Sequence, residues 1–148
     1  MDENEFREFF EKISEFKKND FHPFVKIGGE PEIGNKVSIG FFSEINAKNS
    51  MVKIGDNCDI ASFVSINAAD SHNKCLEFSD DIQRKGIVLE NNVFVGSHCL
   101  IKGGAKIGHH TVIAAGTIVD GVQIPPFSLV SGNPMKIKEG YYEKKSNG

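Results

Sequence analysis

The sequence predicts an all-β fold, a parallel β-helix built from hexapeptide repeats, and three observations support it. In the C-terminal half an aliphatic residue recurs at every sixth position (Leu89, Val95, Ile101, Ile107, Ile113, Val119). Four residues after each of the first five stands a small or compact side chain (Val93, Cys99, Ala105, Thr111, Thr117). The same spacing occurs upstream at Ile27, Ile33, Ile39 and Ile45 and, after a shift of three residues, at Ile54, Ile60 and Ile66. A period of six is neither the two of a strand nor the 3.6 of a helix, and it is typical of parallel β-helices.

Residues 1–20 predict an amphipathic helix. Five apolar residues between positions 3 and 18 recur at helical spacing among charged ones (Phe6, Phe9, Phe10, Ile13, Phe16), and Asp2 stands where a cap is expected. The open end of a solenoid exposes unpaired strand edges. We expect the helix to cover that end. The alternative is that the helix binds a partner subunit.

Residues 21–138 form the predicted repeat domain, with three hexapeptides to a turn and roughly five turns. The aliphatic residue of each repeat points inward, and the small residue lies near the corner. The ladder breaks over residues 68–86, which fit no hexapeptide. An excursion of this length from a regular solenoid is usually functional, so we expect a projecting loop that forms a site. Residues 139–148 are a polar tail whose last residues we expect to be frayed.

Composition narrows the class of protein. The chain has 148 residues and a formal net charge of −3, so charge gives no support to a nonspecific nucleic-acid or membrane-surface role. We expect no membrane span, because no run of 18 apolar residues occurs, and a cytoplasmic location, because the N-terminus lacks an apolar signal core. Two of the three cysteines, Cys58 and Cys99, fall on inward positions, where we expect free thiols in the core.

Three motifs give the repeats a family resemblance. They are Val93-Phe94-Val95-Gly96, Ala115-Gly116-Thr117-Ile118-Val119, and Pro125-Pro126-Phe127-Ser128 followed by Gly132-Asn133-Pro134. Together with His72 they resemble the hexapeptide-repeat acyltransferases, in particular the sugar O-acetyltransferases of the galactoside, maltose and nodulation type and the xenobiotic acetyltransferases. The resemblance covers about residues 27–138 and implies a left-handed β-helix.

The resemblance implies acyl transfer with a loop histidine as general base. His72 matches that histidine to within one residue of loop length, and a neutral imidazole suits proton removal near neutral pH. Asp70 either orients the imidazole or the acceptor, or is a plain turn residue. Ser97 matches the family position beside the thioester, where a donor stabilises the oxyanion. Asn46 stands where family members place an asparagine that contacts the acceptor.

The family's donor is acetyl-CoA, held in a groove between the prisms of a homotrimer. The resemblance places its pantetheine arm along the coils that hold Ser97, Gly96, Gly104, Ala114 and Ala115, and its phosphates near Lys136 and Lys138. The expected acceptor is a sugar or nucleotide-sugar, and the sequence does not decide between O- and N-transfer.

Two alternatives belong to other functional classes. His98, His109 and His110 suggest a metalloenzyme like the γ-class carbonic anhydrases, which share this prism, but their spacing does not match that family's zinc ligands, and we expect no metal. A non-catalytic hexapeptide scaffold explains the repeats but not His72 together with the projecting loop.

Overall fold

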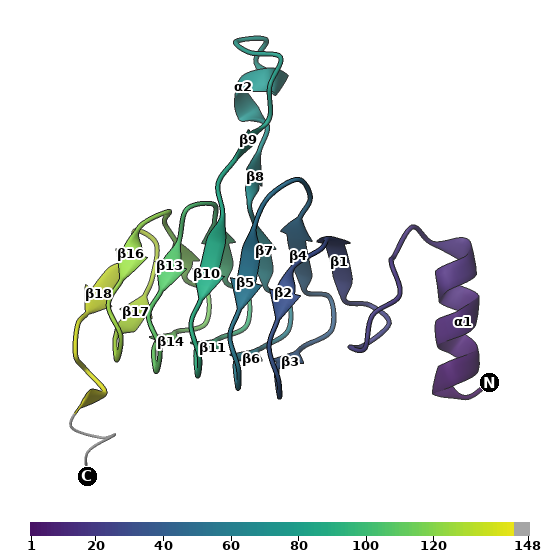
Figure 1. Ribbon diagram of the computed structural model, residues 1–148, viewed down its shortest axis with the longest axis horizontal. Coiled ribbons are helices and arrows are strands. Elements are labelled where there is room, and N and C mark those ends of the chain that lie inside the picture. The colour runs from purple at the N-terminus through teal and green to yellow at the C-terminus, as the bar shows by residue number, and fades with distance from the viewer. Residues whose placement is uncertain (144–148) are drawn as a thin grey trace.

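Parallel strands stacked turn upon turn form a three-sided coil in the computed structural model of the chain, which describes residues 1–143 (Figure 1). Sheet A holds β1 (Lys26–Gly29), β4 (Glu44–Ala47), β7 (Ser65–Asn67), β12 (Leu100–Lys102) and β15 (Ile118–Val119). Sheet B holds β2 (Glu32–Ile33), β5 (Val52–Ile54), β10 (Ile87–Leu89), β13 (Lys106–Ile107) and β16 (Gln123–Ile124). Sheet C holds β3 (Ser38–Ile39), β6 (Asp59–Ile60), β11 (Phe94–Val95), β14 (Val112–Ile113), β17 (Leu129–Ser131) and β18 (Lys136–Lys138).

The core consists of three columns of aliphatic side chains, one behind each sheet. The parallel register pairs each repeat's aliphatic residue with the one a full turn later. The sheet A column is Ile27, Ile45, Ile66, Ile101 and Val119. The sheet B column is Ile33, Ile54, Leu89, Ile107 and Ile124, and the sheet C column is Ile39, Ile60, Val95, Ile113 and Val130. All but Ile33 are buried. The five strands of sheet A mark the five turns that the sequence predicts.

The number of residues between successive core positions varies at only one corner of the prism. Successive column residues are six positions apart between sheets B and C and between sheets C and A in every turn. At the A–B corner, where sheet A leads into sheet B, the spacing is nine from Ile45 to Ile54 and five from Val119 to Ile124. The ladder therefore continues through Ile124 and Val130, beyond its predicted last position at Val119. The segment 68–86 leaves the coil from this same corner.

The N-terminal helix α1 (Glu3–Ile13) is shorter than its apolar spacing predicts. Asp2 caps it as predicted, accepting a hydrogen bond from the Glu5 backbone. The helix ends at Ile13 because the Ser14 hydroxyl donates to the Phe10 carbonyl and accepts from the Phe16 amide. Phe16 therefore lies outside the helix that we predicted to include it.

Helix α1 reaches the coil through aromatic contacts. The rings of Phe6 and Phe10 lie 5.6 and 5.0 Å from that of Phe24, which precedes β1, whereas Phe9 and Ile13 are exposed. No residue of the helix is buried, and Figure 1 shows it standing beside the first turn. Covering of the coil's end by α1 stays a prediction.

The C-terminal end of the coil is finished by a strand that reverses direction. β18 pairs antiparallel with β17, and Ile137 lies opposite Val130. Lys136 and Lys138 of this strand are exposed. The predicted polar tail starts at residue 139, and residues 144–148 lie outside the described part of the chain.

Two cysteines belong to the core, as predicted. Cys58 and Cys99 are buried, and their thiols donate to the carbonyls of Glu90 and Ala114, each at 3.1 Å. Burial raises the pKa of both thiols, because the thiolate form would be poorly solvated there. Cys75 is exposed, and none of the three forms a disulfide.

Candidate active site

The excursion over residues 68–86 is an ordered arm rather than an irregular loop. Two short antiparallel strands, β8 (Ala69–Asp70) and β9 (Gln83–Arg84), form its stem, and α2 (His72–Cys75) lies near its tip. At the base, the Lys85 amide donates to the Ala68 carbonyl, and Arg84 Nε donates to the Lys48 carbonyl. Figure 1 shows the arm projecting away from the coil. The stem carries the predicted catalytic histidine away from the prism wall.

His72 and Asp70 form a pair on the arm. The Nδ1 atom of His72 lies 2.5 Å from Oδ1 of Asp70, and the same oxygen accepts the His72 backbone N–H at 3.1 Å. Hydrogen bonds from His72 hold the pKa of the Asp70 carboxyl below its usual range, so the carboxylate is ionised throughout the neutral range and is protonated only in acid. A carboxylate beside Nδ1 favours the tautomer that leaves Nε2 unprotonated. This arrangement suits a general base.

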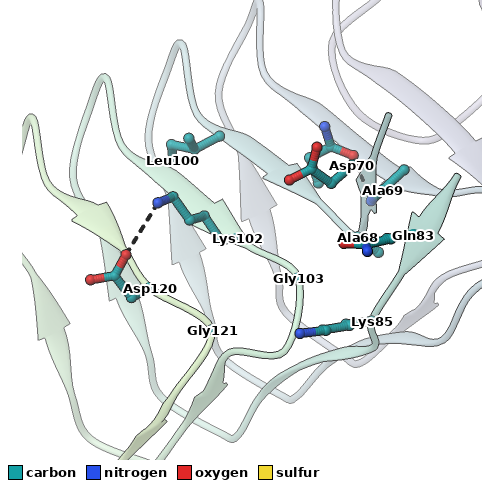
Figure 2. A pocket seen from close by; sticks show the side chains of 11 residues that line it. Ala68, Ala69, Asp70, Gln83, Lys85, Leu100, Lys102, Gly103, Asp120 and Gly121 are labelled. Atoms are coloured by element: carbon teal, nitrogen blue, oxygen red, sulfur yellow. Dashed lines mark hydrogen bonds and ion pairs between the residues drawn. The ribbon is translucent and has the colours of Figure 1, made fainter. Parts of the chain in front are cut away.

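A polar cavity of about 550 Å³ lies beside the base of the arm, over sheet A (Figure 2). Its charged lining residues come from three separate segments, Asp70 and Lys85 from the arm, Lys102 from β12, and Asp120 from the end of β15. Lys102 Nζ and Asp120 Oδ1 are 3.2 Å apart. The other lining residues are Asn67, Ala68, Ala69, Gln83, Leu100, Gly103 and Gly121. His72 does not line the cavity, but it follows the lining residue Asp70 by two positions on the arm.

Glycines allow the chain to pass close to itself on one wall of this cavity. A Cβ atom on Gly121 would lie 2.3 Å from the carbonyl oxygen of Gly103 in the preceding turn. Gly104, which follows the lining residue Gly103, has a φ of +95°, a conformation that residues with a side chain rarely adopt. The wall is therefore made of backbone.

Asn46 supports the base of the arm. Its Nδ2 donates to Oδ1 of Asn67 at 3.1 Å, and this oxygen also accepts the Ala69 N–H at 3.0 Å. Asn46 thus orients Asn67, which lines the cavity, but Asn46 does not line it itself. The predicted contact between Asn46 and the acceptor stays a prediction.

Ser97 lies on a different corner of the prism, where sheet C leads into sheet A. Its carbonyl accepts the Gly116 N–H at 2.9 Å, and its side chain is half-buried. Gly96 is buried against the next turn, since a Cβ there would lie 2.6 Å from the Ala115 nitrogen. Ala115 and Gly116 are exposed beside Ser97. The Ser97 side chain and these small residues form an open edge.

The structure distributes the predicted site residues over three places. Gly96, Ser97, Ala114 and Ala115 share the C–A corner, whereas Asn46, Asp70, His72 and Gly104 lie at or beyond the A–B corner. Lys136 and Lys138 lie on β18 at the C-terminal end of the coil. Strand β12 runs from one corner to the other, so about 16 Å of extended chain separates Ser97 from Lys102. One chain does not bring the two groups together.

Sequence reasoning missed most of the cavity's lining. Lys102 and Asp120 each directly follow a core position, Ile101 and Val119, and the register of sheet A therefore places them on the same outer face. That signal was present in the repeat pattern. Lys85 and Gln83 had no such signal, because they lie in the segment that fits no repeat.

The three histidines of the metal alternative lie along two corners. His98 stacks on Phe63 with ring centroids 4.9 Å apart. His109 and His110 are adjacent, with their Nδ1 atoms 3.0 Å apart, and both contact Phe127. Within residues 1–143, no three His, Cys, Asp or Glu side chains come together as a metal site requires.

Comparison with known proteins identifies the type of repeat. Residues 86–121 match the model of the bacterial transferase hexapeptide, which comprises six repeats. The chain is 33% identical over 111 residues to galactoside O-acetyltransferase of Escherichia coli, an alignment that covers 70% of this chain and 54% of that protein. Residues 86–121 are therefore hexapeptide repeats of the bacterial transferase type. The predicted family resemblance is confirmed.

A second relative and two solved structures agree. The bifunctional protein GlmU of Clostridium botulinum is 32% identical over 131 residues, an alignment that covers 83% of this chain and 28% of that protein. The chain thus spans about a quarter of the length of GlmU and about half of the length of the galactoside O-acetyltransferase. The N-acyltransferase AntD of Bacillus cereus has a TM-score of 0.71 at 17% identity, over 86% of this chain and 74% of that one. A galactoside acetyltransferase in complex with coenzyme A has a TM-score of 0.57 at 29% identity, over 82% of this chain and 66% of that one. The left-handed β-helix is thereby confirmed.

As for membranes, no helix within residues 1–143 of this hexapeptide-repeat protein has the length and apolarity that a bilayer span requires.

Proposed function

We propose that this protein transfers an acetyl group from acetyl-CoA to a hydroxyl or amino group of a sugar or nucleotide-sugar. The observation that carries the proposal is the His72–Asp70 pair, which stands on an ordered arm beside a polar cavity of about 550 Å³. The similarity to galactoside O-acetyltransferase and to a galactoside acetyltransferase solved with coenzyme A supports it. A cytoplasmic location goes with this proposal.

In the proposed reaction His72 is the general base. Its Nε2 takes the proton from the acceptor hydroxyl or amine as that atom attacks the thioester carbonyl carbon. Asp70 holds the imidazole by Nδ1 and favours the imidazolium that forms. The carbonyl electrons move onto oxygen and return as the carbon–sulfur bond breaks, and the departing thiolate takes the proton from the His72 imidazolium, which returns the imidazole to its neutral form. The product is an acetylated acceptor and free coenzyme A.

Ser97 is the proposed donor to the oxyanion of that step. Its hydroxyl makes no hydrogen bond within residues 1–143, so it is free to donate to a bound substrate. An oxyanion requires a donor at about 2.7–3.1 Å. Ser97 of the same chain is separated from the cavity by the width of sheet A, so we infer that the Ser97 corner of one chain meets the arm of another.

Assembly into a homotrimer satisfies this requirement. In a cyclic trimer each chain presents its arm to one neighbour and its Ser97 corner to the other. The C–A corner exposes aromatic side chains that a neighbour would cover, with Phe41, Phe42 and Phe63 between 43% and 52% exposed. These exposed rings and the divided site support the trimer with sites between subunits.

The acetyl-CoA groove would then run along the open edge beside Ser97. Exposed small residues there, Ala115 and Gly116, leave backbone groups accessible to the pantetheine arm. Gly96 and Ala114 contribute to the same edge through the stacked turns. Gly104 would join the groove from the neighbouring chain, and Lys136 and Lys138, both exposed, would meet the phosphates.

An acceptor panel tests the proposed function. We expect thiol release from acetyl-CoA to depend on the acceptor when neutral sugars, acidic sugars and nucleotide-amino sugars are offered, and the acceptor to gain the mass of one acetyl group. A catalysed reaction exceeds the uncatalysed rate by many orders of magnitude, so the signal is unambiguous. Absence of release with every acceptor, together with absence of coenzyme A binding, would refute the proposal.

A further inference from the structure

Lys85 is a charged residue of the cavity for which the reaction above has no use. We propose that Lys85 binds an acidic group of the acceptor, a carboxylate or a phosphate, so that the enzyme prefers acidic sugars to neutral ones. This inference rests on the proposed function, because it names the acceptor class of that same site.

The chain holds Lys85 at the cavity wall. Its backbone N–H donates to the Ala68 carbonyl at 3.0 Å, which closes the base of the arm. Its side chain then runs beside the glycine wall, since a Cβ on Gly103 would meet Lys85 Cβ at 3.3 Å and one on Gly104 would meet its Cδ at 3.6 Å. Figure 2 shows the ammonium nitrogen directed toward the Gly103 turn. The absence of side chains at these two positions gives the lysine room to lie there.

The other charges of the cavity are paired, and that of Lys85 is not. Asp70 contacts His72, and Asp120 forms an ion pair with Lys102. Within residues 1–143, no carboxylate lies within ion-pair distance of Lys85. The lysine therefore offers three N–H donors and one uncompensated positive charge to a ligand.

The two ends of the cavity also differ in charge. Figure 2 shows Asp70 and Lys85 at separate ends of its lining. An acidic group would be repelled at the Asp70 end, because the lowered pKa of that carboxyl keeps it ionised. The same group is attracted at the Lys85 end. An acidic sugar would therefore bind with its acid on Lys85 and its neutral hydroxyl or amino groups toward His72, where the proton is removed.

Steady-state kinetics with matched acceptors tests this. The acceptors are a neutral hexoside, the corresponding uronic acid, a sugar phosphate and a nucleotide-amino sugar, and the variants are Lys85→Met, Lys85→Arg and Lys106→Met. Lys106 is an exposed lysine on sheet B and serves as the control. We expect Lys85→Met to raise KM for acidic acceptors roughly tenfold, as loss of a charge-assisted hydrogen bond does, and to leave KM for the neutral hexoside and for acetyl-CoA within about twofold. Lys85→Arg should keep KM for acidic acceptors close to the wild-type value, because arginine retains the positive charge.

A second variant changes affinity in the opposite direction. Asp120→Asn frees Lys102 from its ion pair, so we expect KM for acidic acceptors to fall by roughly two- to fivefold. Equal KM values for neutral and acidic acceptors in the wild type, or an effect of Lys85→Met on acetyl-CoA alone, would overturn the inference while leaving the proposed function intact. The second of these outcomes would assign Lys85 to the coenzyme's phosphates. Absence of turnover with every acceptor would overturn both.

Discussion

We expect replacement of His72 by alanine to lower the rate of acetyl transfer by about 10²- to 10⁴-fold, the usual contribution of a general base. Without the imidazole, the acceptor must lose its proton to water during the attack. The side chain of His72 is 59% exposed on the arm, so we expect its removal to leave the fold intact. The expected loss is in kcat, with coenzyme A binding unchanged. Thiol release under saturating acetyl-CoA measures it.

The control for this experiment is His110→Ala. His110 is an exposed histidine on the corner between sheets B and C, where it stacks on Phe127. It has no place in the proposed reaction, and its removal should leave the rate within about twofold. A His72→Ala enzyme that keeps more than a tenth of the wild-type rate would exclude the histidine as base.

The largest expected change in stability comes from the sheet B column. We expect Ile107→Ala to lower the free energy of unfolding by about 2–5 kcal/mol, because three methylene or methyl groups are lost from a site that is fully buried between Leu89 and Ile124. Flat stacked turns leave neighbours little freedom to collapse into the cavity. A natural domain has a total stability of only about 5–15 kcal/mol, so the loss is severe.

The neighbouring residue supplies the control. Lys106 belongs to the same strand, β13, but is exposed on the outer face, and Lys106→Ala should change stability by no more than about 0.5 kcal/mol. Urea unfolding followed by circular dichroism, at one fixed protein concentration, measures both variants. Equal losses for the two variants would mean that the inward column does not support the coil.

The stacked core could be predicted because the inward residue of a β-helix is set by a local rule. Ile101 and Ile107 occupy equivalent positions one repeat apart, and no knowledge of distant contacts is needed to place either inside. The rule fails where the chain changes the length of a turn. The five-residue step from Val119 to Ile124 hid the last two column positions, and Ser14 ended α1 earlier than the apolar spacing suggests.

The candidate site could be predicted only in part, for a similar reason. His72 was identifiable because it stands in the one long interruption of the pattern. That interruption leaves the coil at the A–B corner, which is also where the number of residues per turn varies and where Asn49 and Gly104 adopt positive φ. By contrast, the cavity depends on how the arm's stem folds back, which brings Lys85 beside Gly103. No repeat relates these two residues, so only the structure could join them.

We propose that acyl transfer occurs where the arm of one chain meets the Ser97 corner of another. Two inactive variants test it, His72→Ala and Ser97→Trp, the second of which fills the open corner with an indole ring. Co-expressed with different tags and isolated by both, a mixed cyclic trimer contains one intact site, with His72 from one chain and Ser97 from its neighbour. We expect recovery of about one third of the wild-type rate. Mixed assemblies that stay inactive, while mixtures of each variant with wild type are active, would contradict it.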